Sequence, residues 1–317
     1  MGVLLPSYPA PSPSMSTSHL RPLSFGEILD SAFSLYRRHF VLLVSAALLP
    51  LIPSMLMTGV FTRSALSAKP ADAAAAVGAA MIPLILLGFI VQLVMWSALT
   101  RMVGEAWTGG EVSVGDGYRR GLRAFFPLLL SMIVAYLILV VSMFVVILIG
   151  AVVGGIFAAI GVGIGSPTAT VVLMVPVMIL AMGAMIAAMS TLFAVLPAIV
   201  IERKGPIEAI GRSIRLARGA LPRVAGIVFV TFLIIALPMI FVMAVTGGFA
   251  AFTNPGAVPS AGSFWTQQVA NSVVGALTTP FMIASIVILY FDRRVRTEAF
   301  DVQLATDELA ADTFAAR

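Results

Sequence analysis

The residues of this sequence best suited to chemistry are arginines, which gather in short segments and recur there at helical spacing. In the segment 205–219, Arg212, Arg215 and Arg218 stand three residues apart and would lie on one side of a helix. Guanidinium groups placed in this way suit the phosphates of anionic lipid headgroups, each contact contributing roughly 1 kcal/mol near a membrane surface. The candidate contacts to headgroups or to a protein partner are Arg37, Arg38, Arg119, Arg120, Arg123, Arg212, Arg215 and Arg218.

Residue types that support catalysis or metal binding are scarce. The sequence has no cysteine and only two histidines, His19 and His39, which excludes thiol chemistry and makes a poor metal site. It contains no P-loop for ATP, no nucleophile elbow and no zinc-protease motif. We therefore expect a protein that is not an enzyme and that carries no cofactor and no metal.

Uncharged polar side chains within the apolar stretches are the second group of interest. Gln92 lies in one stretch, and Gln267, Gln268 and Asn271 lie in another. Such groups can simply hydrogen-bond between helices, or they can line a cavity between proline-kinked spans, as in transporters. A continuous polar cavity around Gln92 and Asn271 would favour transport, whereas a dry core would favour a scaffold.

Composition determines what must position these side chains. Of the 317 residues, 60% are hydrophobic and 10% are charged, and the mean hydropathy is +1.07. A soluble domain of this size needs a more polar surface, and a membrane β-barrel would show short alternating strands instead of long apolar runs. The predicted fold class is all-α, a polytopic membrane helical bundle. The high pI of about 10.1 then reflects basic residues that flank the spans, so we expect no nucleic-acid partner.

Charges divide the chain into three apolar blocks. Residues 124–201 and 224–291 contain no Asp, Glu, Lys or Arg, and residues 39–100 contain only three. A span needs roughly 20 residues, so each block holds two spans and a turn. The predicted spans lie near 40–61, 76–100, 127–158, 170–200, 224–246 and 265–291.

The distribution of Lys and Arg predicts the orientation. Only Arg63 and Lys69 fall within the expected turns at 62–73, 161–170 and 246–263. The positive-inside rule therefore places both termini in the cytoplasm.

A charged segment precedes each block, and the three segments resemble one another. They read "SFGEILDSAFSLYRRHF" from Ser24, "SVGDGYRRGLRAFF" from Ser113 and "GPIEAIGRSIRLARG" from Gly205. Glu27 and Asp116 follow the two serines at capping-box spacing, which predicts helix starts. We interpret the pattern as a threefold repeat of an amphipathic helix and two spans. The predicted organisation is a disordered Pro- and Ser-rich tail (1–22), a six-span membrane domain (23–305, repeats at about 24–103, 113–201 and 205–292) and an acidic tail (306–317).

The third amphipathic helix illustrates the expected placement. One stripe of it is apolar and recurs at three- and four-residue steps, while the arginines lie on another face. We expect the stripe to lie in the acyl boundary and the arginines to reach headgroups, although docking of a cytoplasmic partner or a bound lipid is the alternative. The stripe consists of Ile207, Ile210, Ile214, Ala217 and Leu221.

Three stretches together carry a family resemblance. "LSFGEILDSAFSLYRRHF" at 23–40, "AIVIERKGPIEAIGRSIRLARG" at 198–219 and "YFDRRVRTEAFDVQL" at 290–304 resemble the membrane domain associated with bacterial glycerophosphoryl diester phosphodiesterases. The resemblance implies six spans in the bacterial cytoplasmic membrane. It does not imply hydrolysis, because the catalytic barrel of those enzymes is a separate domain of about 250 residues, for which this chain has no room.

Two functions remain open from the sequence. The leading hypothesis is a non-enzymatic membrane protein that organises lipid or a partner at the cytoplasmic face. The alternative is a transporter or lipid-exporting permease. The expected partners are the lipid bilayer with its anionic headgroups and a membrane or cytoplasmic protein.

Overall fold

The computed structural model describes residues 21–65, 70–163, 167–247 and 261–298, and these residues form α-helices without any strand. The predicted fold class is confirmed. The predicted acidic tail and all of the predicted N-terminal tail except its last two residues lie outside the described part. The helices are α1 (Phe25–Arg38), α2 (Phe40–Ala47), α3 (Leu51–Ala65), α4 (Pro70–Trp107), α5 (Val114–Arg123), α6 (Phe125–Gly163), α7 (Pro167–Thr191), α8 (Val195–Val200), α9 (Pro206–Ala217), α10 (Leu221–Val245) and α12 (Ala261–Glu298).

Six apolar segments of the described chain are long enough to cross a membrane, as predicted. The last of them continues beyond its predicted end at residue 291, through Asp292 and Arg293, to Glu298. The segments are Phe40–Arg63, Met81–Trp107, Phe125–Ile160, Met174–Val200, Leu221–Val245 and Gly262–Glu298.

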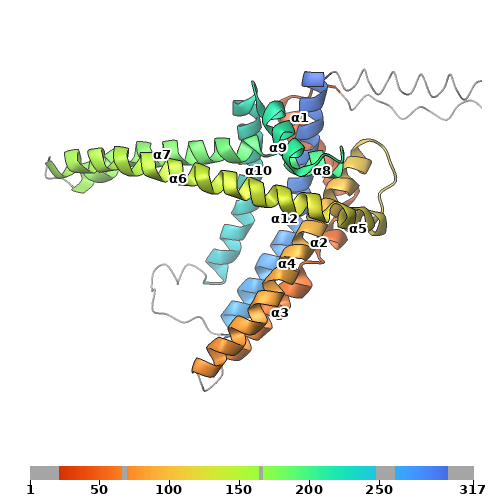
Figure 1. The fold of residues 1–317 in the computed structure, drawn as a ribbon, viewed down its shortest axis with the longest axis horizontal. Helices are drawn as coiled ribbons and strands as arrows, with labels where there is room; N and C mark the ends of the chain where they lie inside the picture. The colour runs from red at the N-terminus through yellow and green to blue at the C-terminus, as the bar shows by residue number, and fades with distance from the viewer. Residues whose placement is uncertain (1–20, 66–69, 164–166, 248–260, 299–317) are drawn as a thin grey trace, which may run out of the picture.

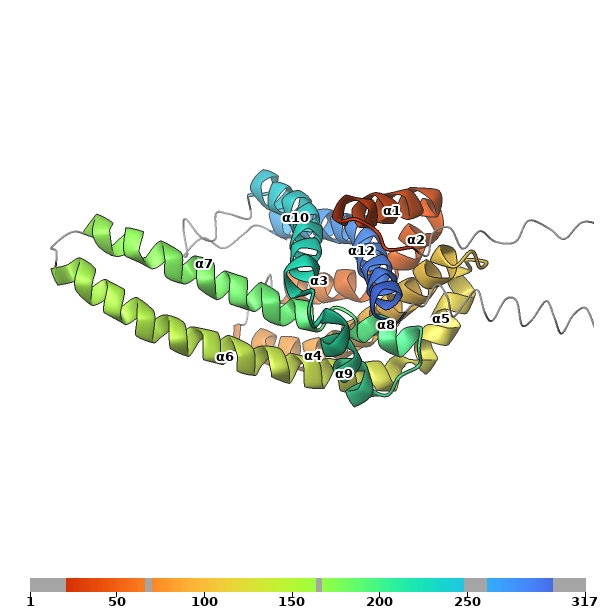
Figure 2. The same cartoon turned by 90° about the horizontal axis from the view of Figure 1, so that it is seen from above.

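The long helices form a bundle and a projecting hairpin. α3, α4 and α12 run side by side, with α10 against α12, whereas α6 and α7 pair with each other and extend crosswise away from the bundle (Figures 1 and 2). The hairpin contacts the remaining helices mainly near its base. Much of α6 therefore exposes large apolar side chains, such as Phe144 at 66% and Leu137 at 61%, as a lipid-facing helix would.

The core lies at the end of the bundle where the charged segments gather. There α1, α4, α8 and α9 surround the C-terminal half of α12 (Figure 1). Tyr290 is the largest side chain that is completely buried in this core. Its most completely buried apolar companions on α12 are Ile283, Ala284, Val287, Ile288 and Leu289.

The amphipathic helices α1, α5 and α9 begin as predicted. Ser24 accepts a hydrogen bond from the Glu27 backbone N–H at 3.3 Å, and Glu27 accepts one from the Ser24 backbone N–H at 2.6 Å, which completes a capping box. Ser113 caps α5 through the Asp116 N–H. α9 starts at Pro206 after Gly205.

The predicted apolar stripe of α9 needs a correction. Ile207 is 78% exposed and Ile214 is 37% exposed, so these two do not share the packing of Ile210. The helix instead buries Ala209, Ile210, Ser213, Leu216 and Ala217 against the protein. Ser213 donates a hydrogen bond to the Thr191 carbonyl at 2.7 Å and accepts one from the Ala194 N–H at 2.9 Å. One face of α9 thus packs against the break between α7 and α8 and satisfies backbone groups there. The predicted apolar stripe did not include this contact.

The first span is interrupted between α2 and α3 at a proline. Pro50 has no N–H, so the carbonyl of Ala46 lacks its normal helical donor. The hydroxyl of Tyr118 on α5 donates to this carbonyl. Burial raises the pKa of Tyr118 to about 12, so the hydroxyl keeps its proton at neutral pH. The second amphipathic helix therefore holds the bend of the first span.

Candidate anion-binding site

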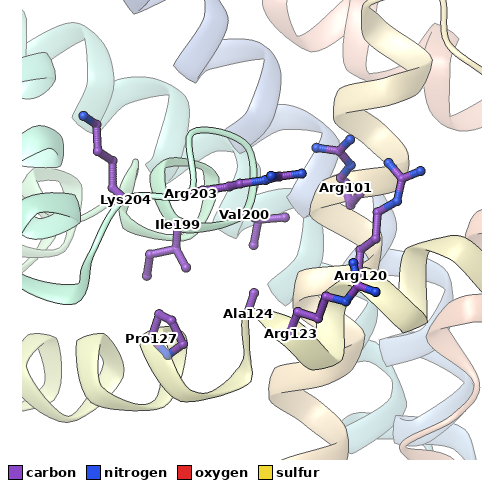
Figure 3. A pocket seen from close by; sticks show the side chains of 9 residues that line it. All are labelled: Arg101, Arg120, Arg123, Ala124, Pro127, Ile199, Val200, Arg203 and Lys204. Atoms are coloured by element: carbon purple, nitrogen blue, oxygen red, sulfur yellow. The ribbon is translucent and has the colours of Figure 1, made fainter.

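A cavity of about 290 Å³ opens where three spans end at the charged face of the protein (Figure 3). Its volume is at the lower end of the range for small-ligand pockets. Five of its nine lining residues are cationic, and the others are mainly apolar. The cavity is lined by Arg101, Arg120, Arg123, Ala124, Pro127, Ile199, Val200, Arg203 and Lys204.

A single carboxylate organises part of this site. One oxygen of Glu105 accepts hydrogen bonds from Arg101 Nε at 2.8 Å and from Arg120 Nη1 at 2.9 Å. The Glu105 side chain is only 19% exposed, so these ion pairs are partly shielded from water. No described acidic side chain pairs with Arg123, Arg203 or Lys204. The site therefore carries a clear excess of positive charge.

Two glycines bring α5 and its arginines against α4. A Cβ atom at Gly117 would lie 2.9 Å from Met102 Cγ, and one at Gly121 would lie 3.1 Å from the Val94 carbonyl oxygen. Only glycine permits so close an approach without a shift of the neighbour. The close packing places Arg120 within reach of Glu105.

The turn after α8 supplies the opposite wall of the cavity. The Lys204 N–H donates to the Ala198 carbonyl at 3.1 Å, and Arg203 adopts a φ of 57°. A non-glycine residue is strained in this left-handed conformation by roughly 1–2 kcal/mol. Arg203 extends from the turn toward Arg101, whereas Lys204 extends in another direction (Figure 3).

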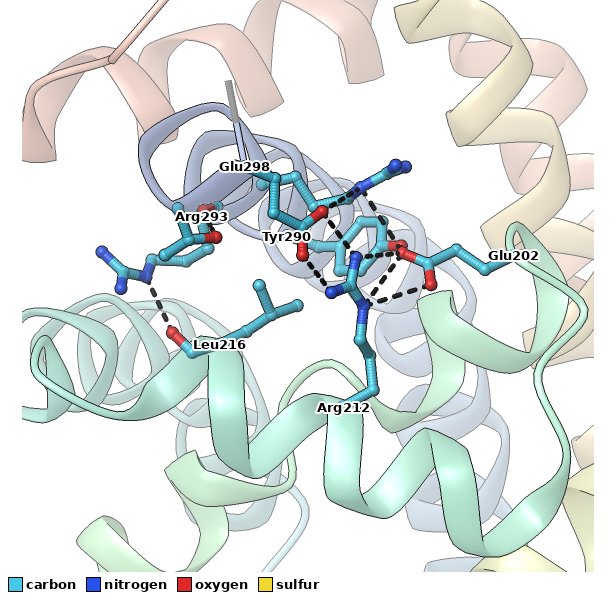
Figure 4. Close-up of polar contacts among 8 residues, drawn as sticks. Glu202, Arg212, Leu216, Tyr290, Arg293 and Glu298 are labelled. Atoms are coloured by element: carbon cyan, nitrogen blue, oxygen red, sulfur yellow. Dashed lines mark hydrogen bonds and ion pairs between the residues drawn. The ribbon is translucent and has the colours of Figure 1, made fainter. Parts of the chain in front are cut away.

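An ion-pair network on the inner side of the same turn fixes it to α9 and α12 (Figure 4). Arg212 Nη2 donates to Glu202 at 2.8 Å and to Glu298 at 2.7 Å, and Tyr290 donates its hydroxyl to Glu202. Burial opposes ionisation of Glu202, but the hydrogen bonds from Arg212 and Tyr290 outweigh it and lower the pKa of Glu202. Glu202 is thereby held inward while its neighbour Arg203 faces the cavity.

A further set of polar contacts anchors the start of α1. The Asp292 side chain is fully buried, and it accepts hydrogen bonds from the Leu23 N–H at 2.8 Å and from Arg296 Nε at 3.0 Å. Arg223 approaches the other oxygen of Asp292 at 3.4 Å. Arg293 donates to the Leu216 carbonyl at 2.8 Å (Figure 4). These partners explain how α12 continues through charged residues beyond its predicted end.

The structure separates the arginines predicted from the sequence. Arg120 and Arg123 line the cavity, while all but one of the others are exposed elsewhere. Arg212 requires a correction, because its side chain is only 12% exposed and is committed to Glu202 and Glu298. The exposed arginines away from the cavity are Arg37, Arg38, Arg119, Arg215 and Arg218.

Sequence reasoning missed three residues of the site, Arg101, Arg203 and Lys204. Each stands beside the end of an apolar block, which is the signal that could have marked them. The last span of one apolar block and the first span of the next both reach the membrane face where the charged segment between them lies. Residues at these span ends can therefore come close together.

A smaller cavity of about 250 Å³ lies beside the bend of the first span, among α2, α3, α4 and α12. Gln92, Ser54, Ser272 and Thr279 supply its polar lining. Asn271 does not line it, in contrast to the polar patch that the sequence suggested. None of its lining residues is charged.

Within the described residues, no group of three or more His, Cys, Asp or Glu side chains could hold a metal ion.

A sequence-family model described as "Domain of unknown function (DUF7847)" matches residues 23–292. No curated protein and no solved structure matches the chain.

Proposed function

The chain belongs to DUF7847, a domain of unknown function, and we propose that it is a non-enzymatic multi-pass membrane protein that organises anionic phospholipid at the cytoplasmic face. The observation that carries this proposal is the cavity lined by four arginines and a lysine, in which Glu105 is the only described acid paired with any of them.

The position of the cavity supports a lipid headgroup as its occupant. Arg101 lies near the end of the second span, Arg123 stands just before the third, and Arg203 stands just after the fourth. Side chains at the ends of spans lie at the level of the headgroups. Arginine forks bind phosphate oxygens in pairs of hydrogen bonds, which are stronger than bonds between neutral groups.

The cytoplasmic orientation and the bacterial inner membrane are parts of the same proposal. The excess of Lys and Arg on the charged face supports the orientation. The likeness of 23–40, 198–219 and 290–304 to the membrane domain of glycerophosphoryl diester phosphodiesterases supports the bacterial location and a distant kinship with that domain.

The test is ligand-induced stabilisation of the purified full chain in neutral detergent. Short-chain phosphatidylglycerol should raise the melting temperature and phosphatidylcholine should not; ligand at about 100 times its Kd adds roughly 2.7 kcal/mol. The double variant Arg123→Gln/Arg203→Gln should lose the shift. The matched control Arg119→Gln/Arg215→Gln, made at exposed arginines outside the cavity, should keep it. Equal shifts with both lipids would count against the proposal.

Transport is the second candidate, favoured by the cavity beside Gln92. A broken span next to a polar cavity is a feature of transporters, and the first span is broken at Pro50 beside this cavity. A cysteine at position 92 should then react with a small membrane-impermeant thiol reagent in intact membranes. A cysteine that stays unlabelled from both sides would argue against a transport path.

A further inference from the structure

We infer that the anion-binding site selects a lipid with a terminal phosphomonoester, as in phosphatidic acid, over the phosphodiester headgroups of ordinary phospholipids. The inference rests on the proposed function, because it specifies the ligand class of the same cavity.

The charge of the site favours a dianion. Glu105 pairs with Arg101 and Arg120 and offsets one of the four guanidinium charges. Arg123 and Arg203 lack an acidic partner among the described residues. A phosphodiester carries a single negative charge, whereas a phosphomonoester carries about −1.5 to −2 near pH 7. The monoester therefore compensates more of the mutual repulsion of these arginines.

The hydrogen-bonding capacity of the site points the same way. Arg101 gives its Nε–H to Glu105, and Arg120 gives its Nη1–H, so each keeps guanidinium N–H groups for a ligand. Arg123, on the same helix as Arg120, and Arg203, on the opposite wall, add two further forks (Figure 3). A monoester presents three terminal oxygens and a diester only two unesterified ones, so only the monoester can engage three forks with separate oxygens.

The strained turn indicates that a side chain is required at Arg203. Glycine would adopt its φ of 57° without cost, yet an arginine stands there and extends toward Arg101 (Figure 3). Strain of this kind persists where the surroundings enforce it and is concentrated at binding sites.

The apolar residues around the site favour a lipid over a soluble phosphate. Ala124, Pro127 and Val200 form part of its wall. Leu122, 60% exposed, directly precedes Arg123, and Phe126, 77% exposed, directly precedes Pro127. Large exposed apolar side chains beside a cationic cavity at the ends of spans are suited to the glycerol and acyl parts of a lipid.

The experiment compares phosphatidic acid with phosphatidylglycerol of the same acyl chains, using the full chain in phosphatidylcholine nanodiscs. At about pH 7.5 we expect roughly tenfold tighter binding of phosphatidic acid, equivalent to one additional charge-assisted hydrogen bond. At about pH 5 the preference should disappear, because the second pKa of the phosphomonoester is about 6. The charged residues at the site are the lining residues Arg101, Arg120, Arg123, Arg203 and Lys204, together with Glu105, which pairs with two of them; none of these is a histidine.

The variants separate this inference from the proposed function. Arg123→Gln and Arg203→Gln should each reduce the preference for phosphatidic acid, and Arg119→Gln, which alters an exposed neighbour, should not. If the two lipids bound with equal affinity, and both bound more tightly than phosphatidylcholine, the proposed function would stand and the inference would be overturned. Binding of neither would overturn both. If inorganic phosphate or glycerol phosphate competed with the same affinity as phosphatidic acid, the inference that the phosphate belongs to a lipid would be overturned.

Discussion

The backbone conformation of Arg203 is the most informative single-residue feature of the site. Its positive φ predicts that Arg203→Gly will not lower the free energy of unfolding, because glycine removes strain of roughly 1–2 kcal/mol. The same change removes a guanidinium from the cavity, so binding of the anionic lipid should weaken several-fold. Thermal unfolding and lipid titration of the same preparation check both effects. A destabilised Arg203→Gly protein would show that the side chain has a structural role.

Glu202 gives a pH-dependent prediction at the same scale. Its pKa is lowered in the folded protein, so its contribution to stability is present above the ordinary carboxyl pKa and is lost as the pH falls toward the lowered value. Glu202→Gln leaves Arg212 with Glu298 alone inside a poorly exposed network and should cost about 3 kcal/mol at neutral pH. As the pH falls below about 5, the melting temperature should fall less steeply for the variant than for the parent protein. Parallel curves would contradict this assignment.

At the scale of elements, the glycines of α5 determine how its arginines reach α4. Gly121→Ala places a Cβ atom 3.1 Å from the Val94 carbonyl and should destabilise the protein by roughly 1–3 kcal/mol. Gly115→Ala on the same helix meets nothing within 4 Å and should be neutral or slightly stabilising, because alanine favours helix. Thermal unfolding distinguishes the two. Similar losses in both variants would mean that α5 does not pack closely on α4.

The elements also show how far sequence reasoning reaches. The helix starts at Ser24 and Ser113 were predictable because capping depends on residues only three positions apart. The burial of Arg212 was not, because its partner Glu298 lies 86 residues away. Likewise α12 passes through Asp292 because Leu23 and Arg296 satisfy the carboxylate. Local patterns predict elements, whereas the site depends on contacts between distant segments.

For the molecule as a whole, the number and positions of the spans were predictable from the charged residues and the lengths of the apolar blocks. The crosswise course of α6 and α7 was not. Those helices are apolar on all sides, so no stripe indicates which neighbour each should face. The threefold repeat stays a prediction. The first and third predicted units contribute their long helices to the bundle, whereas the long helices of the second form the projecting hairpin (Figure 1).

The membrane orientation is testable in the intact molecule, which contains no cysteine to remove. A cysteine at Arg63, at the far end of α3, should react with an impermeant reagent added outside cells. A cysteine at Ile207, exposed on α9, should react only after the membrane is permeabilised. Ser213, which is buried and doubly hydrogen-bonded, is unsuitable as an inside marker. Outside labelling at position 207 would reverse the proposed orientation.

The place of the cationic cavity at the base of the α6–α7 hairpin has a mechanical consequence. Ala124 and Pro127 stand where the hairpin leaves the bundle, and Ile199 and Val200 stand just beyond its return. Under the proposed function, a phosphate bound in this cavity would restrain small displacements at the base of the hairpin, which correspond to larger displacements at its tip. Spin labels at Ile160 on α6 and at Val269 on α12 should give a narrower distance distribution when phosphatidic acid is present. An unchanged distribution with saturating lipid would mean that lipid bound in the cavity does not restrain the α6–α7 hairpin.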